Sequence, residues 1–294
     1  MTARMVERDP WELRLQRLAV ALLVLWSFRA QARFSSAPFP VGIAVWIDVS
    51  FLGDRAAEAW ATAVLAVCLA AYVAGIAAPL ALAGMAFLYT AGGALAYSQG
   101  ALQHHTQLLA LVLIAQLIAH TQAWLWRGST PGRPSGAALA AHYSVEVIAA
   151  SYLLAGLMKI VLSRGEWLAQ VPMIATEIAK THGQAACTTG DAALIARGDA
   201  IAAAILAHPT LSRVFFGTGL LMELASPLAL VGRRAAFAIG AGLLLMHVGI
   251  DALMQIRFRE TGALLLIYLV NVPHLLARAA RMLARRGVRA SARR

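Results

Sequence analysis

The feature that most constrains this chain is a series of apolar stretches, each close to the roughly 20 residues that a helix needs to cross a bilayer. The chain of 294 residues is 60% hydrophobic and only 13% charged, with a mean hydropathy of +0.70. Soluble domains contain about 25% charged residues. The sequence therefore predicts an all-α fold, a polytopic integral membrane helix bundle with additional interfacial helices.

Eight of the apolar stretches are predicted to be transmembrane helices. Two of them are separated only by Pro79, and together they are too long for one span, so a tight hairpin is expected there. The eight predicted spans are Leu13–Ala32, Ala56–Ala78, Leu80–Ser98, His105–Trp126, Ala137–Leu162, Arg213–Val231, Ala235–Gln255 and Thr261–Leu276.

Two connections between the spans are more than turns. Phe39–Gly53 is apolar but too short to cross the bilayer, so it is predicted to be an interfacial or re-entrant segment with Trp46 at headgroup level. Ser163–Ser212 contains two semi-apolar stretches typical of helices, Trp167–Lys180 and Asp191–Ala207. A loop of this length with its own helices is often functional, and we expect it to act as a lid or a substrate surface.

The distribution of basic residues predicts the orientation in the membrane. If both termini are cytoplasmic, 15 basic residues lie on the inner side and nine on the outer side, and seven of the 15 lie in the basic tail 277–294. Because cytoplasmic segments are enriched in Lys and Arg, we expect a multi-pass protein of the cell (inner or plasma) membrane with the loop 163–212 outside. The net charge is +11, and the basic residues that produce it flank the apolar runs. This arrangement indicates contact with the lipid bilayer rather than with nucleic acid. No internal repeat is present, and residues 1–294 are interpreted as a single membrane domain.

Lys159 is the most informative single residue. The chain contains 23 Arg and only two Lys, so lysine is not its default cation. A desolvated lysine can release its proton, whereas arginine effectively cannot, and an ionisable group at membrane depth is a functional candidate by default. Tyr152, Gly156, Lys159 and Ser163 are spaced by four, three and four residues, which places them on one helix face. The alternative is that Lys159 extends its ammonium group to the membrane surface, because it lies near the end of its span.

Polar residues from three other predicted spans reach the outer side together with Lys159. Such a cluster is what an outward-facing site would contain, and the alternative is that each residue is merely interfacial, where polar side chains are well tolerated. The residues are Tyr97, Gln99, His104, His105, His247, Asp251 and Gln255.

A second polar group is predicted deeper in the membrane. His120 and Glu146 belong to adjacent spans and are predicted to form a buried structural hydrogen bond, with a proton path as the alternative. Glu223 shortly precedes Ser226 and Pro227, which favours a kinked helix whose freed carbonyl needs a partner.

No metal site is predicted. His104 and His105 are adjacent and point in different directions, and nothing in the spacing of His105 and His247 requires a shared ion. Motifs of nucleotide-binding proteins, serine hydrolases and zinc proteases are also missing from the sequence.

The stretch Tyr152-Leu-Leu-Ala-Gly-Leu-Met-Lys159-Ile160, followed by Gly165-Glu-Trp167, resembles the signature of the HTTM domain family, which includes vitamin K-dependent gamma-carboxylase. In that enzyme an Ala-Gly-x-Lys-Lys-Leu run carries the lysine that deprotonates vitamin K hydroquinone, and Lys159 falls on that position. Met158 stands where the family has the first lysine of the pair. No counterpart of the carboxylase's large lumenal domain is expected, because only about 18 residues follow the last predicted span.

Two histidine elements extend the resemblance. Gln103-His104-His105 resembles the family's Asn-Asn-His element at the quinone site, which places His105 on its histidine, and His247 is similar to a further family histidine. The resemblance implies Lys159, His105 and His247 as catalytic residues, and a reduced quinone (vitamin K-like, or menaquinol) as cofactor. It further implies a set of residues around the quinone ring: Gln103, His104, His105, Tyr97, Tyr152 and Asp251.

Three classes of function follow from these observations. The first is an integral-membrane enzyme in which Lys159 acts as general base on a quinol, carboxylase- or lyase-like or a quinol-dependent oxygenase, modifying a small secreted peptide or a small molecule at the outer membrane face. The second is a non-enzymatic membrane component, either a maturation or immunity partner or a quinone-binding subunit. A transporter is the third, and it is disfavoured because the chain lacks repeated halves.

The predicted orientation is testable through the two cysteines. Cys187 lies in the loop 163–212, whereas Cys68 lies within an apolar run. A membrane-impermeant thiol reagent should therefore label Cys187 in intact cells, with Cys187→Ser as the unlabelled control. Labelling that occurs only after lysis would place this loop, and the end of the Lys159 span with it, on the cytoplasmic side.

Overall fold

The computed structural model describes residues 8–31, 39–98, 104–126 and 133–291, without the side chains of residues 104–105 and 285–291. Within these residues 86% of the chain is helical and no strand is present, which confirms the predicted all-α class. The chain divides into two compact units, which are described separately. Unit 1 comprises Met1–Val147 and Leu266–Arg294, and unit 2 comprises Ile148–Leu265. The single membrane domain predicted from the sequence stays a prediction.

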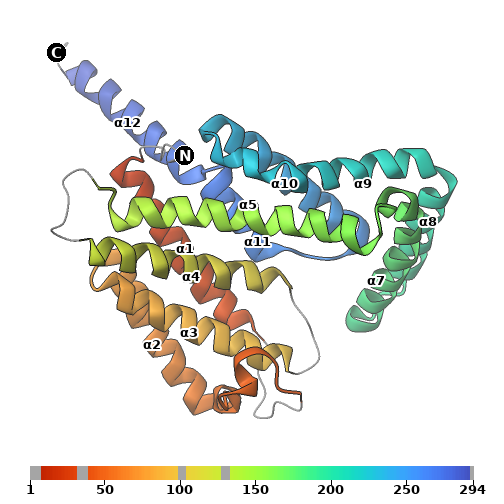
Figure 1. Cartoon of the computed structure of the whole chain (residues 1–294), viewed down its shortest axis with the longest axis horizontal. Coiled ribbons are helices and arrows are strands. Elements are labelled where there is room, and N and C mark those ends of the chain that lie inside the picture. Colours follow the sequence, from red (N-terminus) through yellow and green to blue (C-terminus); the bar gives the residue numbers. More distant parts are fainter. Residues whose placement is uncertain (1–7, 32–38, 99–103, 127–132, 292–294) are drawn as a thin grey trace. The chain divides into compact units, whose positions relative to one another are not determined.

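In unit 1, α2 (Arg55–Ala74) packs against α3 (Ala78–Tyr97), and α3 packs against α4 (His104–Leu125), so the three helices lie side by side (Figure 1). Gly75 ends α2 in the left-handed conformation, with φ 75°, and Pro79 stands in the first turn of α3, so the predicted hairpin is confirmed. Two short 3-10 turns, Gly42–Val45 and Ser50–Gly53, form the segment predicted to be interfacial. The helices of unit 1 are α1 (Pro10–Ala30), α2 (Arg55–Ala74), α3 (Ala78–Tyr97), α4 (His104–Leu125), the first part of α5 (Gly136–Leu162) and α12 (Val272–Ser291).

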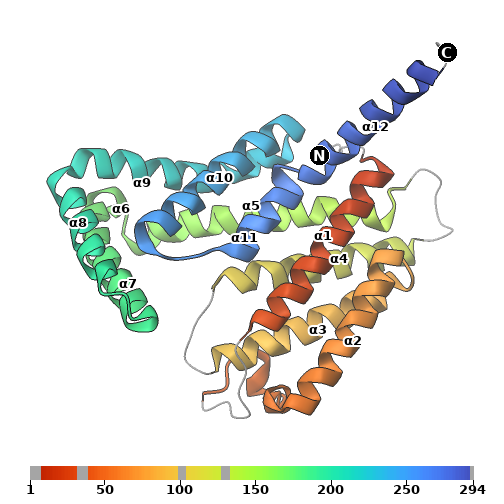
Figure 2. The same cartoon turned by 180° about the vertical axis from the view of Figure 1, so that it is seen from behind.

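Unit 2 contains the end of α5 and the helices that follow it. In Figures 1 and 2, α7 (Ile174–Thr189) and α8 (Ala193–Ala207) lie side by side, and they form most of the loop 163–212. The helices predicted in that loop are therefore confirmed, although a 3-10 turn at Val171–Met173 interrupts the first of them. The further helices are α6 (Trp167–Gln170), α7 (Ile174–Thr189), α8 (Ala193–Ala207), α9 (Pro209–Leu224), α10 (Arg233–Met254) and α11 (Arg259–Leu264), with a 3-10 segment at Ser226–Leu230 and a π-helical turn at Leu265–Leu269.

Five of the described helices are long and apolar enough to cross a membrane, namely α2, α3, α4, α5 and α10. The number rises to seven if each of two bent pairs is one span: α8 with α9, bent by 101°, and α11 through the π-helical turn to α12, bent by 46°. The eight predicted spans are therefore not confirmed. The predicted first span corresponds to α1, which is not among these helices because Glu12, Arg14, Arg17 and Arg29 interrupt its apolar character.

The predicted sixth span also differs from the structure. Instead of a helix over Arg213–Val231, α9 ends at Leu224 and Ser226–Leu230 forms a 3-10 segment, in which Pro227 has no N–H group to continue the α-helical pattern. The following helix α10 begins at Arg233. The carboxylate of Glu223 thus lies in the last turn of α9, next to a change of helix type.

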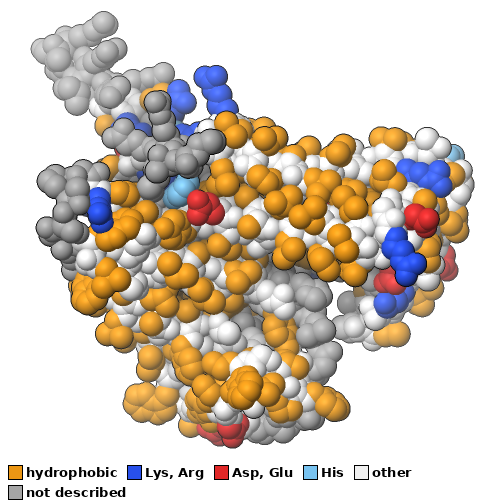
Figure 3. Space-filling model, in the orientation of Figure 1, with side chains coloured by type: hydrophobic (Ala, Val, Ile, Leu, Met, Phe, Trp, Pro, Cys, Tyr) orange, Lys and Arg blue, Asp and Glu red, His pale blue; other side chains and the backbone are white. Residues whose placement is uncertain are grey.

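Apolar side chains cover much of the molecular surface shown in Figure 3. Large ones are exposed on several candidate spans, for example Val67 at 70% on α2 and Leu245 at 71% on α10. Isolated exposed apolar residues are ordinary in soluble proteins, but long apolar helices exposed in this way are compatible with a lipid environment. The length and composition of these helices suggest a helical membrane protein.

Polar contacts inside unit 1 show how such helices satisfy buried groups. Gln116 on α4 is fully buried, and its amide oxygen accepts a 2.6 Å hydrogen bond from the Tyr72 hydroxyl on α2. The amide nitrogen of Gln116 donates to the hydroxyl groups of Tyr268, at 2.7 Å, and of Ser144, at 3.2 Å. One side chain therefore joins α2, α4, α5 and the π-helical turn, in a region where water would not replace a lost partner.

Candidate functional site

The predicted polar face of α5 is directed toward α9 and α10 within unit 2. Tyr152 contacts His247 on α10, whereas Gly156 and Lys159 contact the end of α9. Ser163, the last member of the predicted face, donates instead to the Ile160 carbonyl of its own helix at 3.2 Å. Three of the four residues therefore meet neighbouring helices, as their spacing predicted.

Lys159 forms an ion pair with Glu223 through both carboxylate oxygens. The Glu223 side chain is only 6% exposed, whereas that of Lys159 is 36% exposed. The ammonium nitrogen also lies 6.0 Å from the ring centroid of Trp167, at the outer limit of a cation–π contact. A buried carboxylate without a cation would be strongly unfavourable, so Lys159 is what permits Glu223 to be ionised there.

The close approach of α9 to α5 depends on Gly156. A Cβ atom at this position would lie 3.0 Å from Cδ2 of Leu224 and 3.2 Å from Cβ of Glu223. Beyond the end of α9, Ser226 donates a 2.7 Å hydrogen bond to the Ala149 carbonyl of α5. The glycine and the serine therefore hold the last turn of α9 against α5 on either side of Glu223, and so position its carboxylate at Lys159.

A second polar pair lies on the same face of α5. The Tyr152 hydroxyl and Nε2 of His247 are 2.5 Å apart, and the imidazole is 9% exposed. The His247 ring also packs against Phe258, with ring centroids 4.6 Å apart. Nδ1 of His247 is buried and has no hydrogen-bond partner in the described structure. When the tyrosine donates to Nε2, Nδ1 carries the proton, which leaves one donor for a further group.

The two pairs share one electrostatic environment. The charge of Glu223 acts on the Tyr152 phenol, and the charge of Lys159 acts on the His247 imidazole. The four side chains come from α5, α9 and α10, all within unit 2. A base, an acid, a phenol and an imidazole near one another in an apolar helix bundle can move protons between themselves and a bound molecule.

The other predicted site residues fall into two groups. Asp251 is half-exposed and lies 3.7 Å from Arg257, which makes it part of a surface ion pair. Tyr97 contacts the Thr106 hydroxyl within unit 1. Gln103 and the side chains of His104 and His105 lie outside the described residues, so the predicted contact of His105 with a quinone ring stays a prediction.

One predicted pairing is wrong. Glu146 pairs with His142, one turn before it on α5, at 3.1 Å, and not with His120 on α4. The helical spacing of four residues places His142 and Glu146 on the same face, and this local contact replaces the predicted contact between helices. Nε2 of His120 is buried without a partner.

Sequence reasoning did not find Glu223 as the partner of Lys159. The available signal was a lone carboxylate in an apolar stretch, since a buried acid needs a cation and the chain has few candidates at membrane depth. No group of three or more His, Cys, Asp or Glu residues that could hold a metal ion occurs among the residues the structure describes.

Comparison of the chain with family models, with curated proteins and with solved structures gave no match. The resemblance to the HTTM family therefore rests on the residues around Lys159 and on the histidine elements alone.

The role of Gly156 can be tested by comparison with Gly183, which lies in α7 and has open space around its Cβ position. Gly183→Ala should be neutral or stabilising by up to about 1 kcal/mol, because alanine favours the helix. Gly156→Ala should be destabilising relative to that control by about 1–3 kcal/mol, because the methyl group displaces α9. The measurement is thermal or denaturant unfolding in detergent, and equal effects of the two substitutions would contradict the close approach of α9 to α5.

Proposed function

We propose that this chain is an integral-membrane enzyme in which Lys159 and Glu223 together remove a proton from a lipophilic quinol. The observation that carries the proposal is the ion pair of a half-exposed lysine with a buried carboxylate, beside the Tyr152–His247 pair. The resemblance of the Lys159 stretch to the HTTM signature supports the same chemistry from the sequence.

The ion pair supplies a route by which Lys159 becomes a base. Transfer of its proton to Glu223 converts two opposite charges into a neutral amine and a neutral carboxylic acid, and a low-dielectric environment favours that change. The neutral amine is then competent to accept the proton of a ring hydroxyl. Lysine can take part in this exchange, whereas arginine cannot release its proton.

The residues around the Lys159–Glu223 pair offer a hydrogen-bond donor and an apolar surface, and a quinol with an isoprenoid tail needs both. The unpartnered Nδ1 of His247 is a donor suited to a ring oxygen, and the Tyr152 hydroxyl keeps the proton on Nδ1 by donating to Nε2. On α5, Leu162 lies one helical turn after Lys159 and is 75% exposed, and it offers an apolar surface for an isoprenoid tail. A quinol, when bound, would supply an ionisable hydroxyl group and two reducing electrons, with molecular oxygen as the acceptor of those electrons. The peptide or small molecule that is modified is not specified by these residues.

A second candidate function is non-enzymatic, and one observation favours it. Both carboxylate oxygens of Glu223 accept from Lys159, so the pair satisfies itself without a ligand. Such a pair can be purely structural, holding α9 against α5 in a maturation partner or a quinone-binding subunit. In that case the charges matter and the ability of lysine to lose its proton does not.

Lys159→Arg separates the two candidates because it preserves the charge. In the enzyme, turnover should fall by about 100-fold or more, since general base catalysis contributes factors of that size. Folding and quinone retention should be nearly unchanged. Turnover is measured as oxygen uptake after addition of a reduced menaquinone analogue, and retention as the quinone that copurifies in detergent.

Lys180→Arg is the matched control, because Lys180 forms an exposed ion pair with Glu177 at 3.1 Å on α7 and should tolerate the change. Glu223→Gln should abolish turnover as well, but it also removes the buried partner of the lysine and so destabilises the fold. Full turnover in Lys159→Arg would exclude Lys159 as the base. Wild-type protein that neither retains quinone nor consumes oxygen would contradict both the enzyme and the quinone-binding subunit, and would leave a structural role in a maturation partner.

A further inference from the structure

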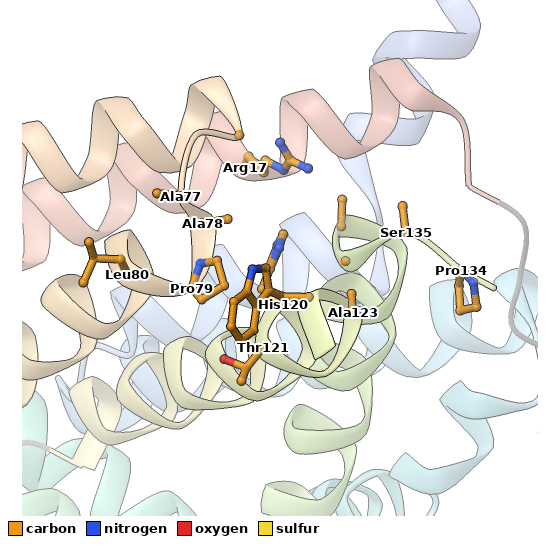
Figure 4. A pocket seen from close by; sticks show the side chains of 14 residues that line it. Arg17, Ala77, Ala78, Pro79, Leu80, His120, Thr121, Ala123, Pro134 and Ser135 are labelled. Carbon is orange, nitrogen blue, oxygen red and sulfur yellow. The ribbon is translucent and has the colours of Figure 1, made fainter. Parts of the chain in front are cut away.

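A cavity of about 660 Å³ lies in unit 1, separate from the residues around Lys159. It is lined by α1, by the turn between α2 and α3, by the end of α4 and by the beginning of α5 (Figure 4). Its volume falls in the range of small-molecule sites and is far larger than a water molecule occupies. The proposed proton transfer makes no use of it.

Two polar side chains in the cavity wall lack partners. Figure 4 shows Arg17 and His120 at the cavity. His120 is 8% exposed, and neither its buried Nε2 nor the buried Nε of Arg17 makes a hydrogen bond to any described residue. Gly75 leaves room for the guanidinium group, since a Cβ atom there would be 3.0 Å from Nη1 of Arg17. Buried donors without partners usually mark a missing ligand or water.

Among the described residues, the cavity wall contains the cation Arg17 and no acidic residue. Within the part of the chain that the structure describes, no carboxylate pairs with Arg17. A second cavity of about 10 Å³ also touches Arg17 and His120, and it has room for no more than a single water molecule. One water can satisfy a donor, but it cannot balance the charge of a guanidinium group.

Two helix N-termini add to this positive character. Both α3, which begins at Ala78, and α5, which begins at Gly136, have their first residues in the cavity wall. Ala77, which precedes α3, makes no side-chain cap hydrogen bond. Free N–H groups and the helix dipole make such termini favourable positions for anions.

From this arrangement we infer that the cavity binds a phosphate group, through the Arg17 guanidinium, the His120 imidazole and the N-termini of α3 and α5. The fork of the guanidinium group matches the geometry of phosphate oxygens. Leu80, 76% exposed, and Trp124, 54% exposed, also line the cavity, and they provide apolar contacts for the acyl chains of a lipid. A phospholipid headgroup and free phosphate share this chemistry, and the experiment distinguishes them.

The test uses the full chain purified in detergent. Native mass spectrometry counts bound phosphatidylglycerol and phosphatidylcholine after equal exposure to both, and thermal unfolding is followed in inorganic phosphate at constant ionic strength. Arg17→Gln and His120→Phe should each lower the occupancy of the preferred ligand by about tenfold or more, since the first removes the guanidinium charge and fork and the second removes a donor to an anion. The matched control is Arg14→Gln, because Arg14 is exposed on the same helix and contacts Trp11 instead of the cavity.

Selective retention of phosphatidylglycerol that depends on Arg17 supports a lipid headgroup as the ligand. Stabilisation by inorganic phosphate that depends on Arg17, without lipid selectivity, supports free phosphate. If Arg17→Gln does not fold, Arg17→Lys retains the charge without the fork and should bind more weakly than wild type. The inference is overturned if wild-type protein shows neither lipid selectivity nor phosphate stabilisation, or if the folded Arg17 variants bind as wild type does.

Discussion

A buried polar group in an apolar helix bundle has no water to replace a missing partner, and each unit of this protein is arranged accordingly. Glu12, fully buried in α1, is bound by Arg8 at 3.1 Å, by Asn271 at 2.8 Å and by His274 at 3.0 Å. The buried Gln116 likewise accepts a hydrogen bond from Tyr72 and donates one to Tyr268. In unit 2 the constraint applies to Glu223, whose buried carboxylate is paired with Lys159.

The proposed chemistry of the Lys159–Glu223 pair depends on how α9 packs against α5. Gly156 and Ser226 place the end of α9 against α5, and this position of the backbone brings carboxylate and ammonium groups together. Several buried polar side-chain atoms of the described residues have no hydrogen-bond partner, and three of them belong to the proposed ligand sites. Nδ1 of His247 beside the ion pair, and Nε of Arg17 with Nε2 of His120 in the other unit, are donors that the protein itself does not satisfy. Each of these exceptions is the basis of a proposed ligand contact.

Much of the fold could be predicted because it follows from local properties of the sequence. The length of the apolar stretch and the position of Pro79 are sufficient to predict the α2–α3 hairpin. The spacing of Tyr152, Gly156 and Lys159 is sufficient to predict that they share one face of α5. The count of eight spans is not confirmed, because apolar length alone does not account for the charges within α1 or for the break after Leu224. Glu223 lies 64 residues from Lys159, and only the packing of α9 on α5 brings them together. His120 was assigned to Glu146 although His142 stood one helical turn away, so a local contact was overlooked in favour of a distant one.

The central claim is that Lys159 and Glu223 act as a proton-transfer pair and not only as a structural one. Exchanging the two residues, Lys159→Glu together with Glu223→Lys, keeps both charges and their attraction but moves the amine to α9, away from its place on α5. The account predicts that either single substitution destabilises the protein, that the double variant recovers most of the lost stability, and that quinol-dependent oxygen uptake remains abolished. A double variant that recovers oxygen uptake together with stability would contradict the claim.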